Sequence, residues 1–182
     1  NNLANLLADA GRNDEALKLR EEAQTLQRKV AGPEHPDTLM ATGNLANSYF
    51  AAGRINEAVA LLAKTSEANP GNTEASLALA TWQTWLGQDA ACETTRRRVV
   101  QQAAGTDQAS TAERAVKAYC LRPSTDEAMM AKVLLLARQA VELGKSHPWL
   151  PYYQLALGLA TYRGGQYAAA EQLPLSPTDI DS

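Results

Sequence analysis

The sequence contains an internal copy of itself. Residues 2–16 read NLANLLADAGRNDEA and residues 44–58 read NLANSYFAAGRINEA, so nine of the fifteen positions are identical. A unit of this length cannot bury its own apolar face, and it becomes stable only by stacking on neighbouring copies. The copy therefore predicts a repeat protein with an extended surface, which is typical of binding rather than of catalysis.

Helical periodicity and glycine turns continue along the chain. From Ile55 to Leu62 the apolar residues follow the i, i+3, i+4, i+7 spacing of one buried helix face. Gly53 precedes this segment, at a point where a tight turn needs a residue that tolerates positive φ. Gly11 in the preceding copy and Gly87 in the following one occupy equivalent positions. The pattern predicts no strand and predicts helices over residues 1–10, 13–30, 37–51, 55–68, 72–86, 89–103, 110–121, 125–143, 149–163 and 166–172.

Two helix starts contain residues that commonly cap helices. Asp37 follows a loop with two prolines and is predicted to be the N-cap of the next helix. Ser110 and Glu113 have the spacing of a capping box, in which both side chains bond free N–H groups at the helix start. That helix is expected to stop before Pro123, because the residue that precedes a proline is disfavoured in the helical region.

Composition and charge exclude several classes of function. The formal net charge of −3 at pH 7 gives no general attraction to nucleic acid or to an anionic membrane. No run approaches the roughly 18 apolar residues of a membrane span, and no signal peptide opens the chain. A glycine-rich phosphate loop and a nucleophile elbow are also missing. We therefore predict no catalytic residue, no metal, no cofactor, no nucleic-acid partner and no membrane partner.

The cysteines and histidines are expected to have structural roles. Cys92 and Cys120 lie in helical patterns, so we expect buried, reduced thiols and a cytoplasmic location. His35 and His147 each precede a proline, and with too few other ligands nearby for a metal site we expect both to be exposed. The sequence also starts within a repeat and without a methionine, which indicates a piece of a longer protein that could have lost a targeting signal.

Arg96, Arg97 and Arg98 form the only run of basic residues. Counted from the turn glycine Gly87, the run falls on the second helix of its pair, where consecutive side chains spread around the helix. Binding of nucleic acid would need a larger basic surface with interleaved aromatic residues. We therefore expect solvated arginines with local salt bridges.

Several positions resemble the tetratricopeptide repeat: Leu45, Ala46, Gly53, Ala58 and Pro70 have the residue types and spacing of that family. The longer form of the unit, with NNLANLL at 1–7 and GPEHPDT at 32–38, resembles the kinesin-light-chain type over about residues 1–70. The segments WLGQDAACETTRRR at 85–98 and TAERAVKAYCLRPSTDEA at 111–128 are similar to repeat regions that follow the kinase domain of large bacterial serine/threonine kinases, although no kinase motif is present.

The resemblance implies an all-α fold, a right-handed α-solenoid of about five antiparallel helix hairpins. The expected domain covers residues 1–173, with repeats at about 1–31, 37–70, 71–104, 109–144 and 148–173. Pro174 ends the last helix, and residues 174–182 are expected to be a disordered or non-native tail. In the family the first helices line a concave groove that binds peptides or other proteins. Apolar faces on the end repeats would also allow a homodimer.

Four asparagines recur with the unit and are predicted to bind peptide. Asn2 and Asn5 lie on the first helix of one copy, and Asn44 and Asn47 lie on that of the next, with each pair on one helix face. An amide offers donors and an acceptor, so it can bond the backbone of an extended peptide without selecting a side chain. The alternative is that these amides cap turns or bond neighbouring helices.

Four further residues complete the predicted site. Phe50, Trp85 and Tyr162 fall near the groove ends of their helices, where they could form apolar pockets for side chains of a ligand. Packing between repeats is the alternative for these aromatics, and it is favoured for Trp82. Thr81 lies on the groove face of the third repeat, which lacks the basic residues that would grip a C-terminal carboxylate.

Together these patterns predict a non-enzymatic scaffold for protein–protein interaction. Its ligand is expected to be an extended peptide or a partner helix in the concave groove. The alternative is a regulatory or substrate-docking segment of a multidomain bacterial serine/threonine kinase, itself non-catalytic. The sequence that precedes residue 1 in the natural protein would distinguish these two hypotheses.

Overall fold

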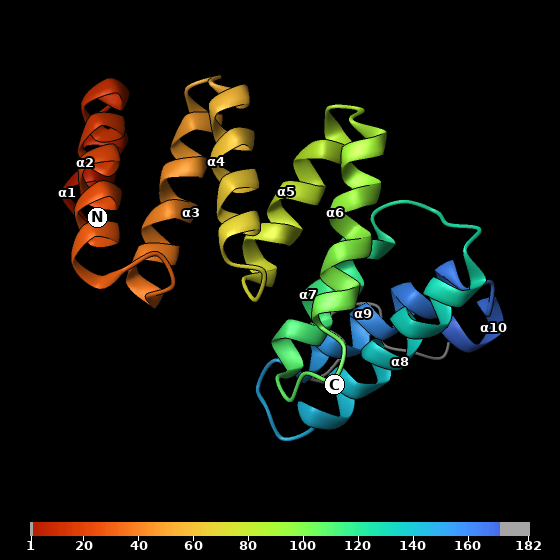
Figure 1. Ribbon diagram of the computed structural model, residues 1–182. Helices are drawn as coiled ribbons and strands as arrows, with labels where there is room; N and C mark the ends of the chain where they lie inside the picture. The colour runs from red at the N-terminus through yellow and green to blue at the C-terminus, as the bar shows by residue number, and fades with distance from the viewer. Residues whose placement is uncertain (1, 172–182) are drawn as a thin grey trace. The chain divides into compact units, whose positions relative to one another are not determined.

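The computed structural model describes residues 2–171, and all the regular structure in that range is helical (Figure 1). The all-α prediction is confirmed. The ten helices of the described range are α1 (Asn2–Asp9), α2 (Asn13–Ala31), α3 (Pro36–Ala51), α4 (Ile55–Ala68), α5 (Thr73–Trp85), α6 (Asp89–Gln102), α7 (Ala109–Cys120), α8 (Glu127–Leu143), α9 (Leu150–Arg163) and α10 (Tyr167–Ala170). The predicted tail at 174–182 lies outside the described residues.

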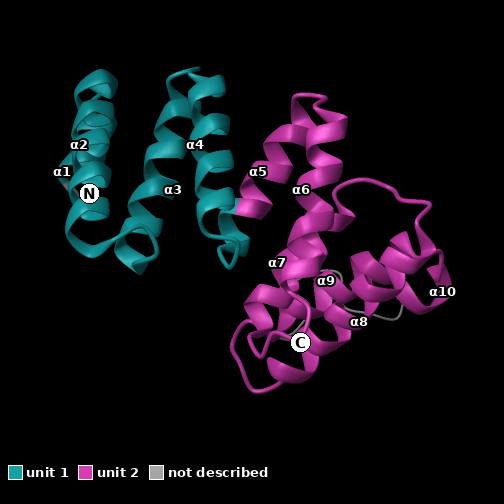
Figure 2. Cartoon of the chain, in the orientation of Figure 1, with its two compact units in different colours: residues 1–75 teal, residues 76–182 magenta. Residues whose placement is uncertain are grey.

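The helices divide between two compact units, which comprise residues 1–75 and residues 76–182 (Figure 2). In the first unit α2 packs against α1 and α3, and α3 packs against α4. In the second unit α7, α8 and α9 pack against one another, and α6 and α10 contact this group. The predicted repeat boundaries between 1 and 173 remain a prediction.

One turn geometry recurs within both units. The turn glycines have φ near +70°, and the next residue sends its N–H to the carbonyl five residues earlier, as in a Schellman motif. Gly53 has φ 71°, and the N–H of Arg54 donates to the carbonyl of Tyr49 at 2.8 Å. The same bond joins Arg12 to Leu7, Gln88 to Gln83 and Gln166 to Thr161, after Gly11, Gly87 and Gly165 with φ values of 76°, 67° and 75°.

Small residues beside each turn let the two helices of a pair approach closely. The fifth residue after the turn glycine is buried in every copy; its four occurrences are Ala16, Ala58, Cys92 and Ala170. The seventh residue before the glycine is equally small, and Ala4, Ala46 and Ala80 are at most 2% exposed. The sulfur of Cys92 lies 3.2 Å from the hydroxyl of Thr84, which joins α6 to α5. The prediction that Cys92 fills a small-residue position in the core is confirmed.

The pair α7–α8 lacks the glycine turn, and arginines from other helices bond the end of α7 instead. Arg96 of α6 is 5% exposed, and its Nη1 donates to the carbonyl oxygens of Tyr119 and Arg122 at 2.9 and 3.1 Å. Its guanidinium carbon also lies 4.5 Å from the ring centre of Tyr119. Arg163 of α9 donates from Nε to the carbonyl of Cys120 at 3.1 Å.

The expectation that all three arginines of the run are solvated was therefore wrong for Arg96. A helix that ends without a Schellman turn leaves carbonyl oxygens without partners, and a buried guanidinium supplies donors for them. Glu93 pairs with both Arg96 and Arg97, and Arg97 also contacts Asp126 at 2.8 Å. Burial opposes ionisation of Glu93, but the hydrogen bonds from both arginines outweigh it and lower the pKa of that carboxyl.

Both predicted caps were also wrong. The N-cap of α3 is His35, whose ring Nδ1 accepts the N–H of Asp37 at 3.2 Å. Pro36 occupies the first helical position because its fixed φ already suits a helix, so the helix begins before Asp37. At α7 the helix begins at Ala109, and Glu113 is buried in a pair with Lys117 rather than turned back to the helix start.

Substitution of the second turn glycine tests the role of the left-handed turn. A Cβ on Gly53 would meet no atom within 4 Å, so only its positive φ penalises a larger residue. Gly53→Ala is expected to lower the free energy of unfolding by about 1–2 kcal/mol, as measured by urea denaturation. Gly53→Asn should cost less, because asparagine tolerates this region. Equal losses for the two variants would contradict a conformational cause.

Removal of the buried guanidinium tests the capping of α7. Arg96→Met keeps the aliphatic length but leaves the carbonyls of Tyr119 and Arg122 without this donor, so we expect a loss of about 3 kcal/mol in unfolding free energy. Arg97→Met is the matched control, since Arg97 has the same partner Glu93 but a side chain that is 40% exposed. That control should cost less than about 1 kcal/mol. Similar losses in both variants would exclude the capping role.

Candidate functional site

The predicted asparagines of the first unit differ in what they contact. Asn2 is the first residue of α1, and its side chain lies outside the described part of the structure. Asn5 is exposed on α1, and its amide oxygen accepts a hydrogen bond from Nη2 of Arg20 at 2.6 Å. That contact corresponds to the alternative role, in which an amide bonds a neighbouring helix. The amide oxygen of Asn5 keeps a second lone pair, and its N–H groups keep their donor capacity.

The amides of Asn44 and Asn47 on α3 have no such contact. Asn47 is exposed and Asn44 is half-buried. Within the described residues, no side-chain hydrogen bond connects either amide to another residue. Since each amide can donate two hydrogen bonds and accept two more, both are candidates to bond a ligand.

Arg20 links α2 to the helices on either side of it. Besides its bond to Asn5, its Nη1 donates to the hydroxyl of Ser48, and that hydroxyl donates to the backbone carbonyl of Asn44 at 2.8 Å. The guanidinium therefore ties α1 and α3 to α2 beside the predicted binding residues. No sequence signal pointed to this link, because the repeat places Leu62 where the first copy has Arg20.

A second polar cluster joins α2 to the turn after α3. The hydroxyl of Tyr49 donates to Glu21 at 2.8 Å, and Arg54 lies 3.5 Å from the same carboxylate. The guanidinium carbon of Arg54 lies 4.6 Å from the ring centre of Tyr49. Burial and the bond to Glu21 raise the pKa of Tyr49. These groups satisfy one another, so the cluster holds the repeats together and leaves little capacity for a ligand.

The four remaining predicted residues lie on three helices. Phe50 is half-buried on α3. Thr81 is exposed on α5, where its hydroxyl donates to the carbonyl of Leu77 at 2.9 Å. Trp85 is 67% exposed and meets Trp82 edge to face, with ring centres 5.6 Å apart. Thr81 and Trp85 thus share one face of α5, and the structure leaves the indole largely open to solvent.

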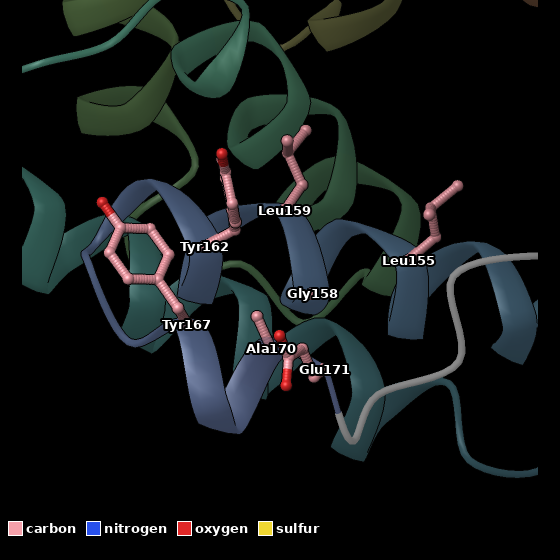
Figure 3. A pocket seen from close by; sticks show the side chains of 7 residues that line it. All are labelled: Leu155, Gly158, Leu159, Tyr162, Tyr167, Ala170 and Glu171. Atoms are coloured by element: carbon pink, nitrogen blue, oxygen red, sulfur yellow. The ribbon is translucent and has the colours of Figure 1, made fainter.

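Tyr162 borders an apolar hollow between α9 and α10 (Figure 3). Leu155, Leu159 and Tyr162 project from one side of α9, and Tyr167 of α10 meets Tyr162 with ring centres 5.2 Å apart. The hollow has a volume of about 310 Å³, and Glu171 is the one charged residue among the described residues that line it. We call it the α9–α10 hollow. Its three α9 residues have the spacing i, i+4, i+7, which indicates one apolar helix face and could have identified this surface from the sequence.

Among the described residues, the cysteines and histidines have structural surroundings rather than those of a metal site. Cys92 and Cys120 are buried free thiols, as predicted, and burial raises the pKa of Cys120 to about 12. A thiol with that pKa stays protonated and is a poor nucleophile. His35 and His147 are exposed, as predicted, and each uses Nδ1 to accept a backbone N–H two residues on. No group of three or more potential metal ligands occurs among residues 2–171.

Over the described range, none of the helices combines the length and the apolar character needed to cross a bilayer.

The fold and the recurrent glycine turn define the class of this protein as a helical-hairpin repeat protein. Models of the tetratricopeptide repeat match residues 1–70 and residues 49–116. Over residues 1–116 the chain is therefore made of tetratricopeptide repeats.

Sequence relatives point to the kinesin-light-chain type of repeat. The chain is 49% identical over 49 residues to Protein KINESIN LIGHT CHAIN-RELATED 2 of Arabidopsis thaliana and 45% identical over 49 residues to KINESIN LIGHT CHAIN-RELATED 3 of the same plant. Each match covers 27% of this chain, and only 7% and 8% of those two proteins.

Solved structures support the same fold over nearly the whole chain. A single-residue variant of a Podosopora anserina kinesin-light-chain-type protein with nearly identical TPR-like repeats matches at a TM-score of 0.57 and 24% identity, covering 94% of this chain and 87% of that one. A double mutant of MamA from RS-1 matches at 0.53 and 17% identity, covering 94% and 86%. The similarity to repeat regions of bacterial kinases remains a prediction.

Proposed function

We propose that the chain is a protein–protein interaction module and that the asparagine-bearing face of α1 and α3 binds a peptide segment of its partner. Tetratricopeptide repeats generally mediate protein–protein interaction, and the chain has them over residues 1–116. The observation that carries the proposal is the pair of amides on α3, those of Asn44 and Asn47, which have no side-chain hydrogen bond to another described residue.

An asparagine in the interior of a helix carries a small energetic cost. Asparagine has a lower helix propensity than alanine, because its side chain competes with the backbone for hydrogen bonds. Near the middle of α3 neither Asn44 nor Asn47 caps a helix end. A ligand backbone would use both the donors and the acceptor of each amide, whereas a charged side chain would use only one kind.

The rigid support around these amides favours recognition without large rearrangement. Arg20 fixes α1 and α3 to α2, and the Tyr49–Glu21–Arg54 cluster fixes the far end of α3. Binding residues held on packed helices lose little conformational entropy when a ligand arrives. The α9–α10 hollow is a separate candidate contact in the second unit, suited to an apolar side chain of the partner. Neither contact needs a cofactor.

Removal of both amides tests the proposed surface. A fluorescein-labelled peptide selected from a random display library on the immobilised chain serves as the probe. The double variant Asn44→Ala, Asn47→Ala is expected to weaken its binding about 10-fold or more in fluorescence anisotropy, since each lost hydrogen bond is worth about 1 kcal/mol.

The control is Asn56→Ala, which removes an exposed amide from α4, the second helix of the same repeat. It should leave the affinity unchanged. Equal affinity of the double variant and the wild type would reject the asparagine face as the binding surface, as would an equal loss in the control. Unchanged unfolding temperatures in all variants would show that the repeats remain folded.

A further inference from the structure

The second helix of the last pair is much shorter than those of the other pairs. The helix α10 has 4 residues, whereas α4 and α6 have 14 each. At a rise of about 1.5 Å per residue, α10 accompanies α9 for only about 6 Å. Its buried residue is Ala170, at the position that Ala58 and Cys92 occupy in the longer pairs. Along the rest of α9, this pair has no second helix within the described residues.

The α9–α10 hollow lies beside the end of this short helix (Figure 3). Leu155 and Leu159 line it from α9, and Ala170 and Glu171 line it from the end of α10. Both leucines are half-buried, and the two tyrosines of the hollow are 54% and 58% exposed. Apolar surface of this kind gains free energy when another apolar group removes it from water.

The chain continues from the edge of the hollow with an uncharged segment that contains two leucines. Residues 172–177 read QLPLSP and follow Glu171 directly. Since one residue spans at most about 3.6 Å, Leu173 and Leu175 are tethered within about 7 and 14 Å of Glu171. A short tether gives an effective concentration on the order of millimolar, so even a weak contact can be occupied. These leucines are the nearest apolar side chains along the chain.

The prolines of this segment suit it to an apolar surface. Pro174 disfavours the helical region for Leu173, so the sequence favours an extended strap over a further turn of α10. Neither Pro174 nor Pro177 has an N–H group. A strap that contains them can lie on leucine and tyrosine side chains with fewer backbone donors deprived of water.

Charge distinguishes this segment from the residues that follow it. The next aliphatic residue is Ile180, which lies between Asp179 and Asp181. If Ile180 entered the hollow, two carboxylates would approach Glu171 and an apolar surface, and both the repulsion and the loss of water would oppose this. Residues 172–177 carry no charge. The hollow therefore fits the leucines of the segment better than it fits Ile180.

We propose that Leu173 and Leu175 occupy the α9–α10 hollow, so that residues 172–177 form a strap that completes the last helix pair in place of a longer second helix. The disorder expected of the tail then applies only to the residues beyond this strap. A partner side chain that entered the hollow would have to displace the strap. The inference is independent of the asparagine face, which belongs to the other compact unit.

A spin label on the segment tests where it lies. Ser176→Cys introduces one accessible thiol, because Cys92 and Cys120 are buried. A nitroxide attached at position 176 of the full chain is expected to broaden the methyl NMR signals of Leu155 and Leu159. Sharp signals from both leucines beside the attached label would overturn the proposal.

Substitutions within the tail separate the strap from the residues beyond it. The double variant Leu173→Ser, Leu175→Ser should abolish the broadening and lower the unfolding temperature by about 2–6 °C, because the hollow loses its apolar cover. Ile180→Ser is the matched control and should change neither measurement. These positions lie outside the ten described helices, so a lower unfolding temperature would not arise from a side chain lost from the helix core. Equal effects of the two variants would reject the assignment to residues 173–175.

A mixing experiment distinguishes the strap from a contact between two copies of the chain. Isotope-enriched chain without a spin label is mixed with spin-labelled chain at natural isotope abundance. Broadening of the Leu155 and Leu159 signals in this mixture would show that the segment docks on another molecule and would reject the proposal. Sharp signals in the mixture, with broadening that persists on dilution of the enriched and labelled chain, would support the strap.

Discussion

Each helix pair that has the glycine turn depends on one residue with left-handed backbone conformation. That residue joins two helices that pack through small side chains. At Gly53 the positive φ reverses the chain within a few residues, and the N–H of Arg54 bonds the carbonyl of Tyr49. The reversal packs α4 against α3, and Ala46 and Ala58 on these helices are at most 2% exposed. A larger side chain at either alanine would separate the helices, and a β-carbon at the glycine would strain the turn. A tight turn therefore needs both the glycine and the small residues on the two helices. This shared requirement explains why the glycine and the alanines recur together in the sequence.

At the α7–α8 connection, which lacks the glycine turn, charged side chains bond the end of the first helix instead. The pair α7–α8 has a longer connection with Pro123 in it, and the last residues of α7 are buried, so their carbonyls need donors that the local backbone does not provide. Arg96 and Arg163 supply them from helices on either side. The acidic partners Glu93 and Asp126 compensate the positive charge; bonds from the backbone N–H of Met129 and from Arg97 lower the pKa of Asp126. At this helix end the buried arginine bonds the last carbonyls, which the backbone of the glycine turn bonds in the other pairs.

Periodicity and spacing predicted the helices because these depend on local pattern. The same reasoning predicted the burial of Cys92, which follows from its register with Ala58. It failed at Arg96, because this guanidinium is buried by hydrogen bonds to carbonyls that lie far away in the sequence. The local sequence pattern contains no information about such long-range contacts. It failed at Asp37 because Pro36 starts the helix first, and the histidine ring before it supplies the acceptor. Asn44 and Asn47 were identified as candidates by their recurrence, whereas the engagement of Asn5 by Arg20 depends on a residue that differs between the two copies.

Under the proposed function, the surface of α3 and the α9–α10 hollow would provide two different kinds of recognition. Amides that bond a peptide backbone contribute affinity for almost any sequence, since every residue presents the same groups. Under the proposed function, the hollow, lined mainly by Leu155, Leu159 and two tyrosines, would favour an apolar side chain of limited size. A partner that used only the amides would be recognised for its extended form alone. Selectivity among extended peptides must then come from side-chain contacts, and Met40 on α3 and the α9–α10 hollow are the described apolar surfaces that could provide them.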